Sequence, residues 1–214
     1  AARAQPDGYT FLVGHMGYMG AGPSLYKKLN YDPVKSFEAV FRFPDTPLVL
    51  LVGPSSPYKN AADLIAAAKA NPGKINFGHA GVGSTSHLIA ALFASKAGIE
   101  VTQVAYKGAA PAMNDLMGGQ VDLMCEQATN AVPQIEGKKV KVYGVTSLQR
   151  LQLPVLKDTP TLAEVGLSDF NVQVWHGLYA PKGTPPAVLA RLNAALKVAL
   201  KDTDLIRKQE ALGL

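Results

Sequence analysis

The sequence predicts an α/β fold built on parallel sheets, because short apolar segments of strand length alternate with longer segments of helical pattern. The chain has 214 residues, of which 48% are hydrophobic and 17% are charged, and its formal net charge is +5. This hydrophobic share excludes a disordered protein, and no apolar run reaches the roughly 18 residues of a membrane-spanning helix. The composition therefore indicates a mildly basic globular protein of one large or two small domains, with acidic partners favoured.

The first elements follow from apolar runs and caps. Residues 11–15 (FLVGH) read as a short strand that ends in a glycine-rich stretch, and residues 47–53 (PLVLLVG) read as a strand buried on both faces. Asn60 can cap a helix over 61–70, which must stop at the following Asn-Pro-Gly. A further strand is expected at 75–80 (INFGHA).

The middle of the chain continues the alternation. An amphipathic helix is expected over 84–98, ending at a glycine, and a strand with β-branched residues over 101–106. A helix over 110–120 ends in Gly-Gly, and the apolar segment 121–126 (VDLMCE) follows as a strand. These elements form a β-α-β-α-β unit with the strand at 75–80.

The last part predicts a strand over 139–147, an extended aromatic segment over 172–181 and a long helix over 185–202 with proline at its start. Residues 1–10 read as the tail of a helix and a Pro-Asp-Gly turn, and the final residues read as a helix that breaks off at Gly213. We therefore expect this sequence to be a fragment truncated at both ends.

Topology rules predict where a ligand would bind. If both crossovers are right-handed and the chain winds both ways from the strand at 75–80, the strand order is second, first, third. The switch point then lies between the ends of the strands at 75–80 and 121–126, and ligands of open α/β sheets bind in that crevice. The loops Gly81–Ser86 and Glu126–Asn130 should face each other there.

The Gly81–Ser86 loop suits an anion, because glycines allow close approach and a helix start offers unpaired N–H groups. The alternative is that Ser84 or Thr85 merely caps the helix. The segment is no P-loop, since no lysine follows Gly83, and no dinucleotide fingerprint, since Ser86 stands where a third glycine is needed. It also lacks the Gly-x-Ser-x-Gly pattern of a nucleophile elbow.

The other reactive residue types form no recognisable catalytic or metal-binding group. The four histidines are scattered without ligand spacing, and His15 stands out only because it lies in the glycine-rich stretch. The single cysteine, Cys125, excludes an intramolecular disulfide and reads as a small core residue. Glu126 could be an exposed acid, or it could accept a hydrogen bond from a ligand hydroxyl, an ammonium group or water. No cofactor, metal or nucleic-acid motif is predicted.

Several motifs in fixed order resemble a known family. The motifs are PDGYT (6–10), LYKKLNYDPVKSFEAV (25–40), NPGKINFGHAGVGSTSHL (71–88), VAYKGAAPAMNDLMGGQVDLM (104–124), DTPTLAEVGL (158–167) and WHGLYAPKGTP (175–185). Together they are similar to the Bug-type extracytoplasmic solute-binding receptors of tripartite tricarboxylate transporters, the TctC-like family. The resemblance implies a type II periplasmic-binding-protein fold, in which two α/β lobes joined by crossing strands close on a small organic acid.

The resemblance also implies lobes and site residues. Lobe 1 would comprise 1–46 and 175–214, and lobe 2 would comprise 47–174, with crossings at 47–53 and about 171–175. Glu126 stands where the family usually has aspartate. The resemblance and the switch-point argument together predict these ligand-binding residues: Gly14, His15, Met16, Gly17, Gly83, Ser84, Thr85, Ser86, Glu126, Gln127, Thr129 and Asn130.

The function implied is capture of a small carboxylate, expected to be a dicarboxylate, and its delivery to membrane transporter subunits. The resemblance implies a periplasmic monomer whose signal peptide has been removed, without catalysis, cofactor, metal, nucleic acid or membrane insertion. Two alternatives remain open. One is an α/β enzyme acting on a small acidic substrate, with Glu126 as base and His15 or His87 assisting; the other is the effector-binding domain of a regulator.

Overall fold

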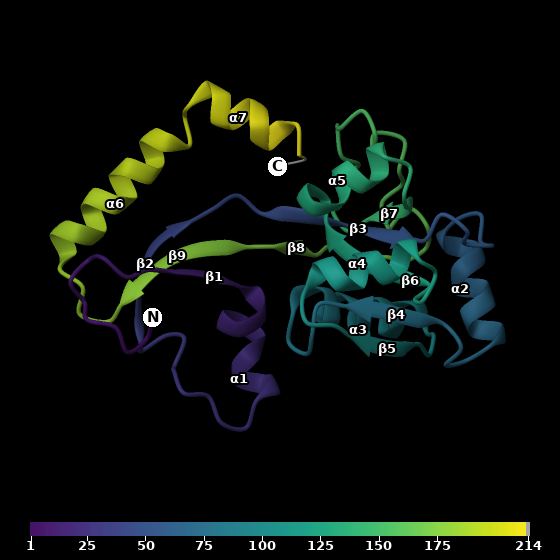
Figure 1. The fold of residues 1–214 in the computed structure, drawn as a ribbon, viewed down its shortest axis with the longest axis horizontal. Coiled ribbons are helices and arrows are strands. Elements are labelled where there is room, and N and C mark those ends of the chain that lie inside the picture. Colours follow the sequence, from purple (N-terminus) through teal and green to yellow (C-terminus); the bar gives the residue numbers. More distant parts are fainter. Residues whose placement is uncertain (213–214) are drawn as a thin grey trace. The chain divides into compact units, whose positions relative to one another are not determined.

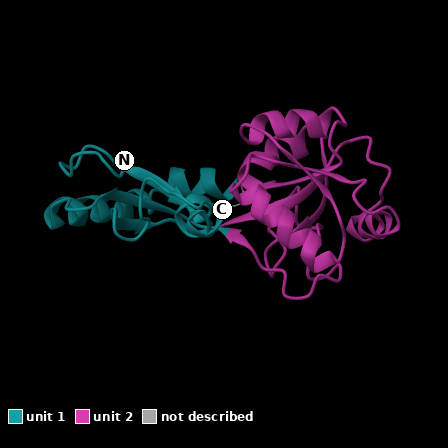
Figure 2. Ribbon diagram, turned by 90° about the horizontal axis from the view of Figure 1, so that it is seen from below, with its two compact units in different colours: residues 1–45, 174–211 teal, residues 46–173, 212–214 magenta. Residues whose placement is uncertain are grey.

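The computed structural model describes residues 1–212, so the predicted helix end at Gly213 lies outside the described part. The chain divides into two compact units (Figure 2). Unit 1 comprises Ala1–Asp45 and Val174–Ala211, and unit 2 comprises Thr46–Gln173 together with Leu212. The chain therefore passes between the units after Asp45, after Gln173 and again after Ala211.

Unit 2 is a mixed sheet wrapped by helices (Figure 1). Its main strand order is β5-β4-β6-β3-β7, and the short strand β8 pairs with β3. The strands are β3 (Thr46–Val52), β4 (Asn76–His79), β5 (Thr102–Ala105), β6 (Leu123–Gln127), β7 (Lys141–Val145) and β8 (Gln173–Val174). The helices are α2 (Ala61–Ala70), α3 (Thr85–Ala97), α4 (Ala109–Met117) and α5 (Ala128–Glu136).

The predicted order of the three central strands is confirmed, because β4 lies between β5 and β6 and pairs with both in parallel. The expectation of parallel sheets holds for β4, β5 and β6 but not for β3, which runs antiparallel to β6 and to β7. A parallel neighbour needs a crossover connection, usually through a helix. The strand β3 enters the sheet directly from unit 1, so no crossover fixes its direction.

The core of unit 2 lies on both faces of this sheet. Every residue of β3 is buried, as predicted from its continuous apolar run. On one face, Val49 of β3 and Met124 of β6 pack in a cluster with Leu116 of α4 and Val132 of α5. Side chains alternate between the faces along a strand, so Glu126 of β6 points to the same face as Met124, toward α4 and α5.

Unit 1 contains a three-stranded antiparallel sheet in the order β1-β9-β2. Its strands are β1 (Leu12–His15), β2 (Phe37–Arg42) and β9 (His176–Pro181), and its helices are α1 (Gly22–Leu25), α6 (Pro186–Ala199) and α7 (Thr203–Glu210). A π-helical turn, η1 (Met16–Ala21), follows β1. No residue of α6 or α7 is buried, whereas α2 and α3 of unit 2 each bury part of one face.

Several boundaries differ from the predictions for identifiable reasons. The glycine-rich stretch after β1 is η1 and not an open loop, because the Gly22 N–H bonds back to the Gly17 carbonyl. The predicted helix 185–202 ends at Ala199, and Asp202 caps a separate helix, α7, through the N–H groups of Asp204 and Leu205. The strand β2 has no counterpart in the predictions.

Over residues 1–212, no helix combines the length and the apolar character that crossing a bilayer requires. Within the same range, no group of three or more His, Cys, Asp or Glu side chains is arranged to hold a metal ion.

Candidate functional site

The segment between β4 and α3 is shaped by two glycines in backbone conformations that L side chains rarely adopt. Gly81 has φ +122° and Gly83 has φ +79°. A Cβ atom at Gly81 would lie 3.1 Å from the Tyr106 carbonyl oxygen, so a side chain there would meet both strain and contact. A turn bond from the Ser84 N–H to the Gly81 carbonyl (3.1 Å) closes the segment directly before α3.

The three hydroxyl residues at the start of α3 have different roles. Ser84 is the N-cap, and its Oγ accepts from the His87 N–H at 3.2 Å. Ser86 Oγ accepts from the Ala80 N–H at 3.0 Å and lies 3.2 Å from Ser84 Oγ. The capping alternative is therefore correct for Ser84, and Ser86 ties the turn to the end of β4. Thr85 Oγ1 has no hydrogen-bond partner among the described residues, although Thr85 is only 8% exposed.

The first N–H groups of α3 remain available as donors. The first intrahelical bond runs from the Leu88 N–H to the Ser84 carbonyl, and within residues 1–212 the Thr85 and Ser86 N–H groups have no acceptor. The first turn of α3 contains no acidic residue. With the positive end of the helix dipole, these groups can hold a carboxylate.

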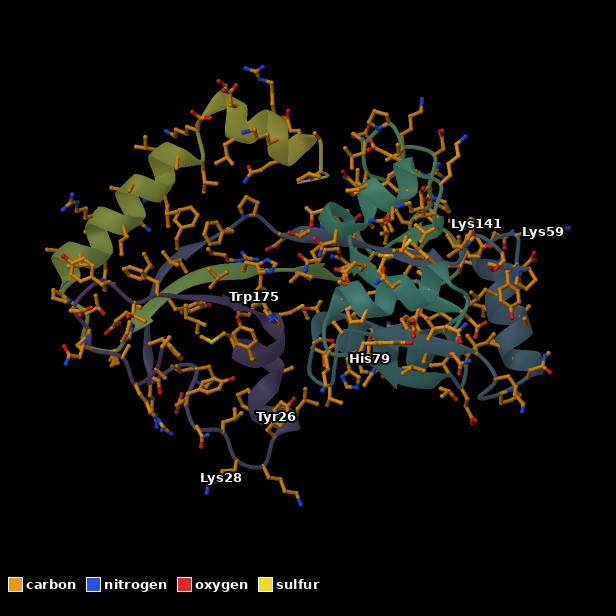
Figure 3. All side chains as sticks on the ribbon, viewed as in Figure 1. Tyr26, Lys28, Lys59, His79, Lys141 and Trp175 are labelled. Atoms are coloured by element: carbon orange, nitrogen blue, oxygen red, sulfur yellow. The ribbon has the colours of Figure 1, made fainter. Side chains whose placement is uncertain are left out.

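Two histidines hold this turn in place. His79, the last residue of β4 and labelled in Figure 3, is 2% exposed, and its Nδ1 accepts from the Gly81 N–H at 3.2 Å. His87 Nδ1 accepts from the Gly83 N–H at 3.3 Å, and the two imidazole rings lie 4.7 Å apart. Burial lowers the pKa of His79, the hydrogen bond with the Gly81 N–H opposes this shift, and the neighbouring His87 adds to it. Neither histidine was among the predicted ligand-binding residues, because their spacing matches no ligand motif, and His87 had a role only in the enzyme alternative.

The second predicted segment, Glu126–Asn130, is not a loop. Glu126 and Gln127 end β6, and Ala128 begins α5 without any break. The reason is the buried stripe formed by Ala128, Ala131 and Val132, whose helical spacing places them against the sheet. Thr129 and Asn130 are therefore residues of the first helical turn.

Glu126 is a buried carboxylate, 5% exposed. Its Oε1 accepts from the Gln127 N–H and from Asn130 Nδ2, each at 3.0 Å. Burial raises the pKa of Glu126, and these two hydrogen bonds oppose the shift. The alternative of an exposed acid at a strand end is wrong. The start of α5 has no side-chain cap of its own.

A pocket of about 350 Å³ opens between α4 and α5 beside this carboxylate. Glu126 and Asn130 line it from the β6–α5 side, and Ala110, Met113 and Asn114 line it from α4. The α4 residues were absent from the predicted site, since their sequence shows only an ordinary helix.

The four predicted residues of unit 1 lie at the end of β1. Gly14 is required by packing, because a Cβ atom there would lie 2.7 Å from the Tyr179 ring and 2.8 Å from Met19. His15 Nδ1 accepts from the Gly17 N–H at 2.9 Å, while Met16 begins η1. His176, the β9 residue paired with His15, has its ring centroid 6.0 Å from that of His15.

The protonation state and the tautomer of His15 follow from its burial and its hydrogen bond. Burial lowers its pKa and the nearby His176 lowers it further, so the ring is neutral at pH 7. Because Nδ1 accepts a hydrogen bond, the proton is assigned to Nε2. His15 therefore presents an N–H donor.

Within unit 2, the structure brings two of the predicted groups to one edge of the sheet. The parallel strands β4 and β6 are neighbours, so Gly83–Ser86, after the end of β4, and Glu126–Asn130, across the end of β6, lie at the carboxyl ends of adjacent strands. Gly14–Gly17 belongs to unit 1. Contact of any of these residues with a ligand stays a prediction.

This arrangement is typical of α/β proteins that bind an anionic ligand at a topological switch point. The ligand would bind at the start of α3, and the sequence around that helix start carries no nucleophile or cofactor motif. A comparison with protein families matches residues 1–211 to the tripartite tricarboxylate transporter family receptor. The chain belongs to this family, and the predicted resemblance is confirmed.

Several curated relatives are longer than this chain. It is 41% identical over 212 residues to a UPF0065 protein of Agrobacterium vitis from the TAR-I ttuE-ttuC' intergenic region, covering 99% of this chain and 60% of that protein. The chain thus spans about three fifths of the length of such relatives.

Three solved structures share the fold over 99% of this chain, which confirms the predicted fold class. The periplasmic binding protein BugD is 44% identical with a TM-score of 0.92, covering 70% of that chain. MatC from Rhodopseudomonas palustris, with bound malate, is 39% identical with a TM-score of 0.91 and 71% coverage. A further R. palustris protein, with adipate, is 33% identical with a TM-score of 0.93 and 70% coverage.

Proposed function

We propose that this protein is a periplasmic receptor that captures a small organic dicarboxylate between two lobes and delivers it to a membrane transporter. One carboxylate of the ligand binds the start of α3, where the Thr85 and Ser86 N–H groups and the Thr85 hydroxyl have no protein partner in the described chain. This anion-ready helix start is the observation that carries the proposal.

The family supports the remaining parts of the proposal. The chain belongs to a family of transporter receptors, and two related structures contain malate and adipate, both of which are dicarboxylates. His15 Nε2 and the segment Gly14–Gly17 of unit 1 would contact the ligand when the lobes close. A ligand shifts this equilibrium only if it favours the closed state.

An enzyme is the weaker alternative. Its proposed base, Glu126, is buried with Oε1 already occupied by two donors, and its proposed assistants, His15 and His87, each use Nδ1 to accept from a backbone N–H. These hydrogen bonds hold the local backbone and side chains in place and leave no base poised for catalysis at the bonded atoms. Turnover of a bound acid, detected by mass spectrometry, would support the enzyme alternative.

The receptor is tested by thermal shift with the full-length protein and a panel that contains malate and adipate. A ligand at 100 times its dissociation constant stabilises the folded state by about 2.7 kcal/mol. We expect at least one dicarboxylate to raise the melting temperature. If no organic acid in the panel does so, the proposed function is wrong.

A further inference from the structure

The pocket between α4 and α5 is lined by a carboxylate and therefore differs chemically from the proposed anion site at the start of α3. It has about 350 Å³, enough for part of a small molecule, and Met113 and Ala110 give it an apolar wall. Glu126 lines it opposite α4, and among residues 1–212 its lining contains no lysine or arginine. A second ligand carboxylate in this pocket would therefore face the Glu126 carboxylate without a cationic partner.

One carboxylate oxygen of Glu126 accepts no hydrogen bond from the described residues. Both hydrogen bonds that Glu126 accepts go to Oε1, from the Gln127 N–H and Asn130 Nδ2, and Oε2 accepts none from residues 1–212. Every fully enclosed side-chain N or O atom of the described chain has a partner, so Oε2 is not sealed in the core. Because Glu126 is 5% exposed and lines the pocket, its free oxygen faces the pocket.

A ligand that covers this acceptor removes it from water, which costs free energy unless the ligand donates a hydrogen bond to it. Hydroxyl and ammonium groups are two common donors to a carboxylate among small organic acids. Glu126 belongs to β6, directly beside β4, whose end leads into the carboxylate-binding turn. The donor would therefore lie on a carbon close to the bound carboxylate.

We propose that the α4–α5 pocket selects dicarboxylates that carry a hydroxyl or ammonium group next to a carboxylate, with Glu126 Oε2 accepting the hydrogen bond. This inference rests on the proposed receptor function and narrows its substrate class. A plain dicarboxylate leaves Oε2 unpaired when the ligand covers the pocket, so it binds more weakly.

The test uses three four-carbon dicarboxylates that differ at one carbon. Succinate has no donor, malate has a hydroxyl and aspartate has an ammonium group. Their dissociation constants are measured by isothermal titration calorimetry on the full-length protein at pH 7.5. A hydrogen bond to a charged group corresponds to a change of roughly tenfold or more in affinity, so malate or aspartate should bind at least about tenfold more tightly than succinate.

Variants identify the acceptor. Glu126→Gln keeps the size of the side chain and an acceptor oxygen but loses the charge, so it should abolish a preference for aspartate and weaken one for malate. Ala110→Leu fills the pocket from an exposed position on α4 and should reduce both preferences without touching Glu126. Glu136→Gln, the same change at the exposed end of α5, is the matched control and should leave all three affinities unchanged.

The outcomes separate the two proposals. Equal binding of the three acids, unchanged in Glu126→Gln, overturns the selectivity and leaves the receptor intact. A preference for aspartate over malate identifies the donor as ammonium, and the reverse identifies it as hydroxyl. Failure of every dicarboxylate to bind overturns the receptor function, and the selectivity with it.

Discussion

The two helix starts at the carboxyl edge of the unit 2 sheet differ in charge and in capping. The start of α3 is capped by Ser84, follows two glycines with positive φ, and has no acid in its first turn. The start of α5 has no side-chain cap and is preceded by Glu126, a buried carboxylate that accepts from the Gln127 N–H. The N–H group directly before α5 is thus already bonded to a side-chain carboxylate, whereas no acidic side chain lies in the first turn of α3.

The largest expected effect comes from the turn before α3. Gly81→Ala should destabilise the fold by about 1–3 kcal/mol, the cost of a strained backbone residue, because φ is +122° and Cβ would lie 3.1 Å from the Tyr106 carbonyl oxygen. It should also abolish dicarboxylate binding by moving the Thr85 N–H. Urea denaturation and calorimetry measure the two effects.

The matched control for this change is Gly73→Ala. Gly73 also has positive φ, +72°, but nothing lies within 4 Å of a Cβ atom there. We expect Gly73→Ala to be destabilised by backbone strain but to bind the dicarboxylate as the wild type does. Loss of binding in both variants would mean that stability, and not the turn, limits binding.

A smaller effect is expected at the Thr85 hydroxyl. Thr85→Val keeps the shape of the side chain and the backbone N–H but removes Oγ1, which has no partner among residues 1–212. Dicarboxylate affinity should fall roughly tenfold, as for loss of a hydrogen bond to a charged group. Thr203→Val, at the first residue of α7, is the same substitution at an equivalent helical position. An equal loss of affinity in both variants contradicts the assignment.

The pH dependence of stability should distinguish the two helix starts. Burial lowers the pKa of His79, so its folded form resists protonation. The contribution of His79 to the free energy of unfolding is fully present above the pKa of about 6.5 that it has in the unfolded chain. This contribution is lost as the pH falls from that value toward the lower pKa of the folded state. Burial lowers the pKa of His15 and His176 in the same way. His79→Asn retains an acceptor for the Gly81 N–H and should make the unfolding free energy less dependent on pH between 5 and 7.5.

The start of α5 should show the opposite sign and the smallest effect. Burial raises the pKa of Glu126, so the folded state binds its proton more tightly than the unfolded state. Its contribution is complete below the unfolded pKa of about 4.3 and is lost as the pH rises through the folded pKa. Glu126→Gln should therefore gain stability relative to the wild type as the pH rises, and Glu136→Gln should not. A flat difference for Glu126→Gln would contradict the burial argument.

The sequence predicted what local patterns and handedness rules determine. The apolar run of β3, the Asn60 cap of α2, the Gly98 end of α3 and the order of three central strands agree with the structure. The antiparallel direction of β3 could not be predicted, because it depends on where the chain enters from unit 1.

The site was predicted in outline and not in its details. Glycines and hydroxyls marked the start of α3, but the roles of His79 and His87 depend on backbone bonds formed only in the folded turn. The helix α5 was missed because Thr129 and Asn130 read as polar loop residues. The α4–α5 pocket brings together residues far apart in sequence, such as Met113 and Gln134.

The most direct test is a crystal structure of the full-length protein with malate. We expect one malate carboxylate within hydrogen-bond distance of the Thr85 and Ser86 N–H groups, and the malate hydroxyl donating to Glu126 Oε2. A bound malate whose carboxylates both lie away from the start of α3 would contradict this expectation.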